Sequence, residues 1–178
     1  MGELQIIKLR KEVPNGTFDC GNSSINSLIV ESYFPTILQH GYAYQVSCQG
    51  VVLGYYMIKF RNIKLDSCPE EISDYKSTII SDCCSVHISY IAINKKYQNK
   101  SIGTSLLNII IKRVLDLCRE FPVMLLTLEA LKDKYDWYIN KGFKPFDGNE
   151  LDNSCPTINM YMLCILDQNL VDNYYNNI

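Results

Sequence analysis

The sequence predicts a mixed α/β fold, in which a central, mostly antiparallel sheet contains one parallel strand pair and is flanked by helices. Two observations support this fold class. The segments Gly41–Ser47 and Val51–Phe60 are rich in Tyr, Val and Ile and lie three residues apart, which is typical of an antiparallel hairpin. Further along, a helical pattern joins the apolar segments His87–Ile93 and Val123–Leu128, and such a crossover pairs its two strands in parallel.

Length and composition favour one globular domain over residues 1–178. The chain has 178 residues, of which 47% are hydrophobic and 20% are charged. Its net charge of −2 and isoelectric point of about 5.7 provide no global field for nucleic acid, so such a partner would need a local basic patch. Charges interrupt Met1–Lys11, and no stretch reaches about 18 apolar residues, so we expect a cytoplasmic protein with no membrane segment.

Eight cysteines are expected to be reduced thiols, because disulfides are rare in the cytoplasm. Cys83 and Cys84 lie close to His87, but a structural zinc needs four suitably spaced ligands, so we expect no metal. A cysteine nucleophile assisted by His87 is the alternative chemistry. No glycine-flanked turn surrounds either cysteine, which disfavours it.

Local patterns assign the elements of the N-terminal part. Leu4–Arg10 is an expected edge strand, and Pro14-Asn15-Gly16 is a turn. A helix follows Asn22–Ser24, because these residues can cap it and apolar residues then recur at three and four positions. Arg61–Ser85 mixes Pro, Ser and Asp with short apolar pieces, which favours a loop with a short helix near Glu70–Ile80.

Helical spacing is strongest after Ile102, where apolar residues follow one face for almost five turns and end before Pro122. A second helix is expected at about Lys132–Asn140, ended by Gly142 as a C-cap. The remaining expected elements are closing strands at Phe143–Phe146 and Thr157–Leu166, with a turn-rich connection at Asp147–Ser154.

The junction between the first buried strand and the long helix favours an anion. Asn94–Ser101 places small and polar residues where amides and the helix dipole attract phosphate. Gly103 permits close approach to the backbone, and Lys100 adds a positive charge. Neither G-x-x-x-x-G-K-S/T nor G-x-G-x-x-G is present. Many junctions of this kind bind nothing, so the loop alone leaves its ligand open.

Two segments together carry a resemblance to a known family. Gln98-Asn99-Lys100-Ser101-Ile102-Gly103 resembles the pyrophosphate pattern Q/R-x-x-G-x-G/A of the GNAT superfamily of N-acetyltransferases, although Ser101 replaces its first glycine. Downstream, Trp137-Tyr138-Ile139-Asn140-Lys141-Gly142-Phe143 resembles the F/W-Y-x-x-x-G-F segment of the same family. Phe18-Asp19-Cys20-Gly21-Asn22 is also similar to the opening of members related to toxin–antitoxin acetyltransferases.

The resemblance implies a GNAT-like sheet whose parallel strands splay around an acetyl-CoA site. It implies that the backbone of Ile91, Ala92 and Ile93 pairs with the pantetheine arm. The amide near Ile93 would also stabilise an oxyanion. The resemblance further implies that the coenzyme pyrophosphate is held by the amides of Gln98, Asn99, Lys100, Ser101, Ile102, Gly103 and Thr104.

The resemblance also assigns the chemistry. Tyr138 is implied to act as an acid beside the thioester sulfur. An amine such as lysine, with a reference pKa of about 10.4, must lose a proton before or during attack. Glu129 and His87 lie at ends of the two buried strands and are the candidate bases, and His87 has a suitable ordinary pKa. An ordered water chain is an open alternative.

We therefore expect an N-acetyltransferase that moves an acetyl group from acetyl-CoA to a primary amine by direct attack. The acceptor is open among small amines, protein or peptide amines, and aminoacyl-tRNA, which the toxin-like opening favours. The alternative is a catalytically silent acyl-CoA-binding sensor or scaffold. A tRNA, an antitoxin and a second copy of the chain are open partners. A basic face or a merely solvated surface is expected from Lys95, Lys96, Lys100, Lys112 and Arg113.

Overall fold

The computed structural model describes residues 3–74, 76, 80–146 and 155–165. Its strands are hydrogen-bonded in the order β1-β2-β3-β4-β5-β7-β6, and β4 and β5 form the parallel pair of a mostly antiparallel sheet. The expected mixed α/β fold is therefore confirmed. The strands are β1 (Gln5–Lys8), β2 (Tyr42–Cys48), β3 (Val51–Lys64), β4 (Asp82–Ile93), β5 (Leu125–Leu131), β6 (Lys144–Pro145) and β7 (Thr157–Leu163).

Among the described residues, the four expected helices occur in the expected order with different lengths, and the helix Tyr33–Ile37 is an additional one that the sequence pattern did not predict. The expected second helix begins as a 3-10 turn at Lys132–Lys134 and becomes α-helical later. Further 3-10 turns lie at Leu65–Ser67 and Lys95–Tyr97. The α-helices are α1 (Ser23–Glu31), α2 (Tyr33–Ile37), α3 (Glu70–Ser73), α4 (Ile102–Leu117) and α5 (Tyr135–Ile139).

Contacts divide the chain into two compact units. The first contains Met1–Phe60 and His87–Ile110, and the second contains Arg61–Val86 and Ile111–Ile178. The expectation of one domain over residues 1–178 stays a prediction. Among the described residues, no helix is long and apolar enough to cross a membrane.

The first unit contains the predicted hairpin and the N-terminal helices. The β2–β3 turn has two residues, Gln49 and Gly50, with φ of 49° and 79°, which is the left-handed pair that a tight hairpin requires. A Cβ on Gly54 would lie 2.2 Å from the carbonyl oxygen of Ala92, so β3 needs a glycine where β4 approaches it. The Asn22 side chain caps α1 as expected, accepting from the Ile25 amide.

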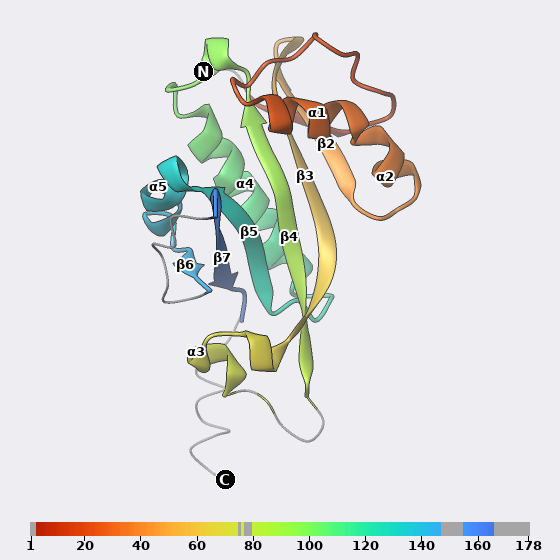
Figure 1. Cartoon of the computed structure of the whole chain (residues 1–178). Helices are drawn as coiled ribbons and strands as arrows, with labels where there is room; N and C mark the ends of the chain where they lie inside the picture. The colour runs from red at the N-terminus through yellow and green to blue at the C-terminus, as the bar shows by residue number, and fades with distance from the viewer. Residues whose placement is uncertain (1–2, 75, 77–79, 147–154, 166–178) are drawn as a thin grey trace. The chain divides into compact units, whose positions relative to one another are not determined.

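Helices α1 and α2 lie beside β2 and β3 in the first unit (Figure 1). The hydroxyl groups of Ser32 and Tyr90 are 2.6 Å apart, and Thr36 Oγ1 accepts from the Ala43 amide at 3.0 Å, so polar contacts tie these helices to the sheet. The apolar core between them is made of Leu9, Val13, Phe18, Ile29, Ala43, Tyr55, Met57, Tyr90 and Ala92.

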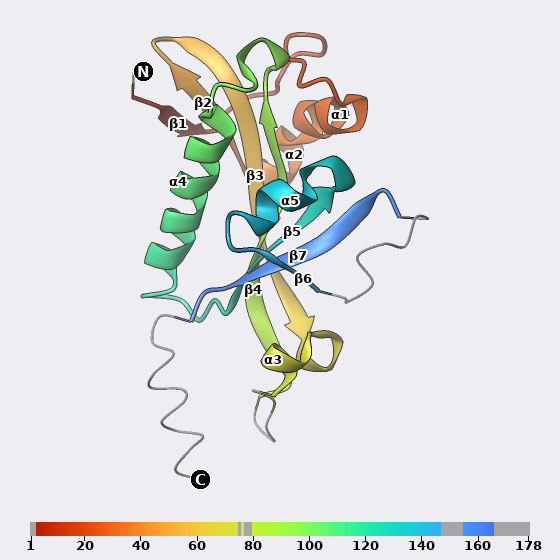
Figure 2. The ribbon, with the colours of Figure 1, turned by 90° about the vertical axis from the view of Figure 1, so that its left-hand side faces the viewer.

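The second unit places α5 beside β5, β7 and β6 (Figure 2). Strand β7 pairs antiparallel with β5 and with β6. Gly142 has φ of 88°, its amide donates to the Ile139 carbonyl, and the Phe143 amide donates to the Tyr138 carbonyl at 3.2 Å. This is the left-handed C-cap that the sequence predicted.

The interpretation of Arg61–Ser85 as a loop is wrong at both ends. Strand β3 continues to Lys64, and β4 already begins at Asp82. These extensions are strands because Cys83 and Ser85 are buried, Ile63 is half-buried and Leu65 is fully buried in the core of the second unit. In the sequence, small polar residues hid the alternation of buried and exposed positions that marks these strand ends.

Other helices and strands have ends that differ from the predicted ends by a few residues. The expected helix near Glu70–Ile80 is the four-residue α3, and residues 75 and 77–79 of that range lie outside the described part of the chain. The expected connection Asp147–Ser154 and position 166 also lie outside it. The Phe143–Phe146 strand is reduced to two residues, and the edge strand of the expected Leu4–Arg10 is β1.

Candidate functional site

The loop after β4 turns twice through left-handed backbone before α4 begins. Asn99 has φ of 58° and Ser101 has φ of 60°. The Ser101 carbonyl then accepts from the Ser105 amide at 3.0 Å, which begins the α4 hydrogen-bond ladder. Left-handed backbone costs roughly 1–2 kcal/mol in a residue with a Cβ and little in glycine. This conformation explains why the family pattern has glycine at the position of Ser101.

Gly103 leaves open space at the first turn of α4. A Cβ at this position would meet Ile93 Cγ1 at 3.9 Å, which is ordinary contact, and the residue does not have positive φ. Neither packing nor backbone conformation therefore requires a glycine here. The space lies beside amides that have no acceptor within their own helix, where an anion can approach the backbone.

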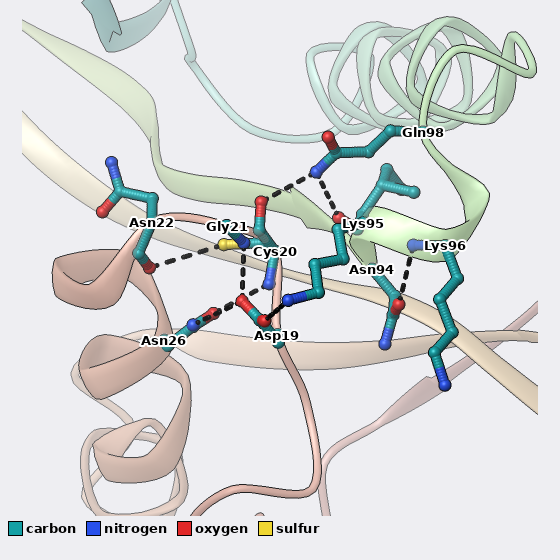
Figure 3. A network of polar contacts seen from close by, with 10 residues as sticks. Asp19, Cys20, Gly21, Asn22, Asn26, Asn94, Lys95, Lys96 and Gln98 are labelled. Carbon is teal, nitrogen blue, oxygen red and sulfur yellow. Dashed lines mark hydrogen bonds and ion pairs between the residues drawn. The ribbon is translucent and has the colours of Figure 1, made fainter.

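Side chains fix the loop to the N-terminal segment of the same unit (Figure 3). Gln98 Nε2 donates to the carbonyl oxygens of Cys20 at 2.8 Å and Ile93 at 2.9 Å. The Lys95 amide donates to the Asp19 carbonyl at 2.9 Å, and its ammonium forms an ion pair with the Asp19 carboxylate. Segments that are far apart in sequence therefore hold one another.

Asp19 is the centre of this network. Its carboxylate also accepts from the Gly21 amide at 2.7 Å and from Asn26 Nδ2 at 3.1 Å. The hydrogen bond from Lys95, followed by those from Gly21 and Asn26, lowers the pKa of Asp19 to about 2. The carboxylate is therefore charged at neutral pH and holds its donors.

The end of β4 lies directly before this loop. Ala92 and Ile93 are buried and Ile91 is half-buried, so the backbone at these positions is held by its neighbours. His87, the candidate base on the same strand, is 4% exposed in the first unit. A buried imidazole can take a proton from an amine only if the amine or a chain of waters reaches it, so the role of His87 as a base stays a prediction.

Tyr138 lies on α5 of the second unit and is surrounded by aromatic rings. Its ring meets Trp137 edge-on with centroids 4.7 Å apart and Phe143 with centroids 5.6 Å apart. Burial raises the pKa of Tyr138 to about 12, so the phenol keeps its proton at neutral pH. Among the residues that the structure describes, none makes a hydrogen bond to its hydroxyl, which leaves this donor available.

Glu129 is the other candidate base and also belongs to the second unit. It lies on β5 with an exposed side chain, and its Oε1 is 3.9 Å from Arg61 Nη1. Both side chains are more than two-fifths exposed, so solvent screens this ion pair and it contributes little to stability. Glu129 is thus a solvated carboxylate whose catalytic role stays a prediction.

The described cysteines do not form a metal cluster. No group of three potential His, Cys, Asp or Glu ligands occurs in the described ranges. Burial, with a smaller effect from nearby Cys68, raises the pKa of Cys83 to about 12, and burial also raises that of Cys84. These thiols are protonated at neutral pH, which disfavours them as nucleophiles.

The structure brings the predicted residues together in two groups. His87, Ile91–Ile93 and Gln98–Thr104 belong to the first unit, whereas Glu129 and Tyr138 belong to the second. Their union in one active site stays a prediction. Sequence reasoning missed the contacts from Asp19 and Cys20 to the loop, and the unusual opening Phe18–Asn22 was the signal that could have directed attention there.

The predicted basic face is partly neutralised. Lys95 is paired with Asp19, whereas Lys96 and Lys100 are exposed in the first unit, and Lys100 Nζ lies 5.6 Å from the centroid of the Tyr97 ring. Lys112 and Arg113 are exposed in the second unit. Any role of these cations in binding RNA stays a prediction.

No model of a known protein family matches the chain. No curated protein matches it significantly either. Several solved structures of toxins do match over nearly their whole length. A tyrosine-to-phenylalanine mutant of KacT is 19% identical with a TM-score of 0.73, and the match covers 90% of this chain and 95% of KacT.

Two AtaT structures show the same similarity. AtaT complexed with acetyl-methionyl-tRNAfMet is 18% identical with a TM-score of 0.74, over 97% of this chain and 99% of AtaT. The AtaTR structure bound with acetyl-CoA is 20% identical with a TM-score of 0.73, over 97% of this chain and 98% of that one. These toxins have the GNAT fold, so the expected GNAT-like architecture is confirmed.

Proposed function

We propose that this protein is an N-acetyltransferase that moves an acetyl group from acetyl-CoA to a primary amine. The observation that carries the proposal is the loop Gln98–Thr104, which two left-handed residues turn and two side-chain hydrogen bonds fix just before α4. Such a loop at a helix N-terminus suits a pyrophosphate. AtaT, which shares this fold, has been solved with acetyl-CoA, and this supports the same ligand here.

The first unit would bind the donor. Amides of Gln98, Asn99, Lys100, Ser101, Ile102, Gly103 and Thr104 hold the pyrophosphate, and the backbone of Ile91, Ala92 and Ile93 pairs with the pantetheine arm. Acetyl-CoA supplies an activated thioester when bound. The backbone at the end of β4 holds the thioester in place, and the amide near Ile93 is the donor for the carbonyl oxygen.

Tyr138 would give its proton to the departing sulfur. As the new carbon–nitrogen bond forms and the carbon–sulfur bond breaks, the phenol donates its proton and the thiol leaves neutral. The raised pKa keeps the phenol protonated at neutral pH, and the absence of a hydrogen bond to its hydroxyl from any described residue supports this role. The proton that the amine loses passes to Glu129, to His87 or to ordered water, and the phenolate regains one from solvent.

The acceptor we propose is the amino group of an aminoacyl-tRNA. AtaT has been solved with acetyl-methionyl-tRNAfMet, and this chain matches that structure over nearly its whole length. AtaT has also been solved with the C-terminus of the antitoxin AtaR, which supports an antitoxin as a protein partner here. The exposed Lys100 beside the loop supplies positive charge for a phosphate backbone.

A second candidate function is a catalytically silent protein that binds acyl-CoA as a sensor or scaffold. The observation in its favour is the positive φ of Ser101, because a non-glycine residue in this conformation holds the loop under strain. A strained loop can bind its ligand without being suited to turnover. The two functions differ in whether bound acetyl-CoA releases its thiol in the presence of an amine.

The deciding experiment is a thiol-release assay with acetyl-CoA and a panel of acceptors that contains small amines, peptides and aminoacyl-tRNAs. Mass spectrometry of the acceptor then identifies the acetylated amine. Thiol release with an aminoacyl-tRNA, and an acetyl group on its α-amine, would support the full proposal. Binding of acetyl-CoA without thiol release in the presence of any acceptor would favour the silent sensor. Acetylation of small amines alone would show that the acceptor is a small amine and not an aminoacyl-tRNA.

A further inference from the structure

We propose that Gln98 is a positioning residue. Together with Asp19 and Lys95, it braces the loop Gln98–Thr104, which we call the cofactor loop, against the N-terminal segment Phe18–Asn22. This inference rests on the proposed function, because the loop is the proposed pyrophosphate site. It assigns part of the acetyl-CoA affinity to residues nearly eighty positions away in sequence, none of which need touch the ligand. We call this set of contacts the loop brace.

The Gln98 side chain uses its amide nitrogen within the protein. Nε2 donates to the Cys20 carbonyl, 78 residues away, and to the Ile93 carbonyl at the end of β4. An amide group has two N–H donors, so both are engaged and directed at backbone oxygens (Figure 3). The side chain therefore ties the loop to two other segments, and the backbone rather than the side chain is left to meet an anion.

This geometry explains the residue types at the first position of the family pattern. The pattern Q/R-x-x-G-x-G/A allows Gln or Arg. Both side chains carry several N–H donors, and Arg Nε is as many bonds from Cα as Gln Nε2 is. A methionine has nearly the length of glutamine but no N–H donor. A glutamate would instead direct carboxylate oxygens at two carbonyl oxygens.

The second half of the brace is ionic. Lys95 holds Asp19 through its amide and through its ammonium group, and Asp19 in turn accepts from Gly21 and Asn26. The ion pair with Asp19 offsets the charge of Lys95, so this lysine holds the loop and adds little to the positive potential at the surface. Lys96, its neighbour, is exposed, and its amide donates to Asn94 Oδ1.

The brace is needed because the loop conformation is unfavourable by itself. Asn99 and Ser101 both have positive φ, which most L-residues avoid without support from neighbours. Contacts on either side of them, at Lys95 and Gln98 and at the start of α4, hold the chain in this form. Without the Gln98 hydrogen bonds, the loop also adopts conformations in which its amides no longer point to one place. The affinity for the ligand then falls in proportion to the fraction of molecules whose loop has the binding conformation.

The experiment compares Gln98→Met with Gln98→Arg in the full chain. Isothermal titration calorimetry with acetyl-CoA measures the Kd, and the thiol-release assay measures kcat and KM. We expect Gln98→Met to raise the Kd and the KM for acetyl-CoA about tenfold, as loss of two hydrogen bonds predicts, with kcat changed less than about threefold. Gln98→Arg restores the donors and should return the Kd to within about threefold of the wild type.

A matched lysine pair tests the ionic half, and does so even if Gln98→Met fails to fold. Lys95→Met and Lys96→Met each remove one positive charge beside the loop, but only the first removes a contact to Asp19. Because Lys95 and Asp19 are both more than two-fifths exposed, solvent weakens this pair, and we expect Lys95→Met to raise the acetyl-CoA Kd only about threefold. Lys96→Met should change the Kd less than about 1.5-fold. Equal losses in the two variants would mean that charge alone matters, and would overturn the ionic half.

The outcomes separate the brace from the proposed function. A wild-type protein that binds no acetyl-CoA overturns both. A wild-type protein that binds it, with Gln98→Met binding equally well, overturns the brace and leaves the proposed function standing. A fall in kcat at unchanged KM would mark Gln98 as part of the chemistry, which also contradicts a positioning role.

Discussion

The cofactor loop of the first unit and the tyrosine helix of the second unit are held by opposite means. Polar contacts fix the loop: Gln98 and Asp19 between them donate to or accept from backbone groups of Cys20, Gly21, Ile93 and Lys95. Tyr138 is instead fixed by the rings of Trp137 and Phe143 and by burial, and its hydroxyl makes no hydrogen bond to any described residue.

In the proposed reaction, the difference follows from what each region would present. A pyrophosphate site presents backbone amides, so the backbone must be locked in an unfavourable conformation by groups that do not occupy the amides themselves. A proton donor presents one hydroxyl, which a hydrogen bond within the protein would engage. Apolar packing fixes a ring without using its polar atom.

Tyr138→Phe tests the tyrosine side and should have the largest effect. Phenylalanine keeps the ring contacts to Trp137 and Phe143 but removes the proton, so we expect kcat to fall about 10²–10⁴-fold with the acetyl-CoA KM nearly unchanged. Thiol release measures the rate, and thermal unfolding checks that the fold is retained. Tyr135→Phe on the same helix is the control, with kcat expected within about threefold. Full turnover in Tyr138→Phe would remove the assigned acid.

Asp19→Asn tests the loop side and should affect binding rather than rate. The neutral amide loses the ion pair to Lys95. Both side chains are more than two-fifths exposed, so we expect the acetyl-CoA Kd to rise about threefold near neutral pH. The pKa of Asp19 is lowered to about 2, so its contribution is present above the ordinary carboxyl pKa and is lost only as the pH falls through about 2. The gap between wild type and variant should therefore persist at about pH 5. A gap that closes there would contradict the assignment.

Much of the fold could be predicted, because its signals are local. The two-residue turn at Gln49-Gly50, the left-handed Gly142 and the apolar face of α4 each follow from residue types at fixed spacing. The ends of β3 and β4 could not be predicted. Their burial depends on contacts of Leu65 and Cys83 with β5 and β7, which no local pattern encodes.

The candidate site divides in the same way. The loop and Tyr138 could be proposed from the sequence because both resemble short family patterns, and their roles stay predictions. The contacts of Asp19 to Lys95 and of Cys20 to Gln98 join segments more than seventy residues apart, and a single sequence carries no record of such pairs. The left-handed φ of Ser101 was also hidden, because serine rarely adopts it.

Ser101→Gly tests whether the loop is held against its own preference. Glycine removes the left-handed penalty but is more flexible when unfolded, so the net gain in stability should be under about 1 kcal/mol. We also expect the acetyl-CoA Kd to fall by up to about threefold, because the competent loop is more populated. Ser105→Gly is the control, and it should destabilise α4 by about 0.5 kcal/mol. A lower melting temperature for Ser101→Gly would show that the left-handed conformation of Ser101 does not strain the folded loop.

Glu71→Gln tests whether the second unit also depends on polar contacts away from Tyr138, and should have the smallest effect. The Glu71 carboxylate accepts from Tyr161 at 2.5 Å and from Lys144 at 2.8 Å, and these donors, Lys144 foremost, lower its pKa. The stabilisation is therefore present above the ordinary carboxyl pKa and is lost as the pH falls through the lowered value. Since Glu71 and Lys144 are both substantially exposed, we expect less than about 1 kcal/mol at neutral pH.

The measurement is urea unfolding of wild type and Glu71→Gln at about pH 7 and then at successively lower pH, where the difference should shrink as the carboxylate is protonated. The kcat and the acetyl-CoA KM should be unchanged, because this clamp joins α3 to β6 and β7 rather than holding the tyrosine ring. A kcat loss comparable to that of Tyr138→Phe would mean that polar contacts also position the proton donor, and the contrast between the two regions would then fail.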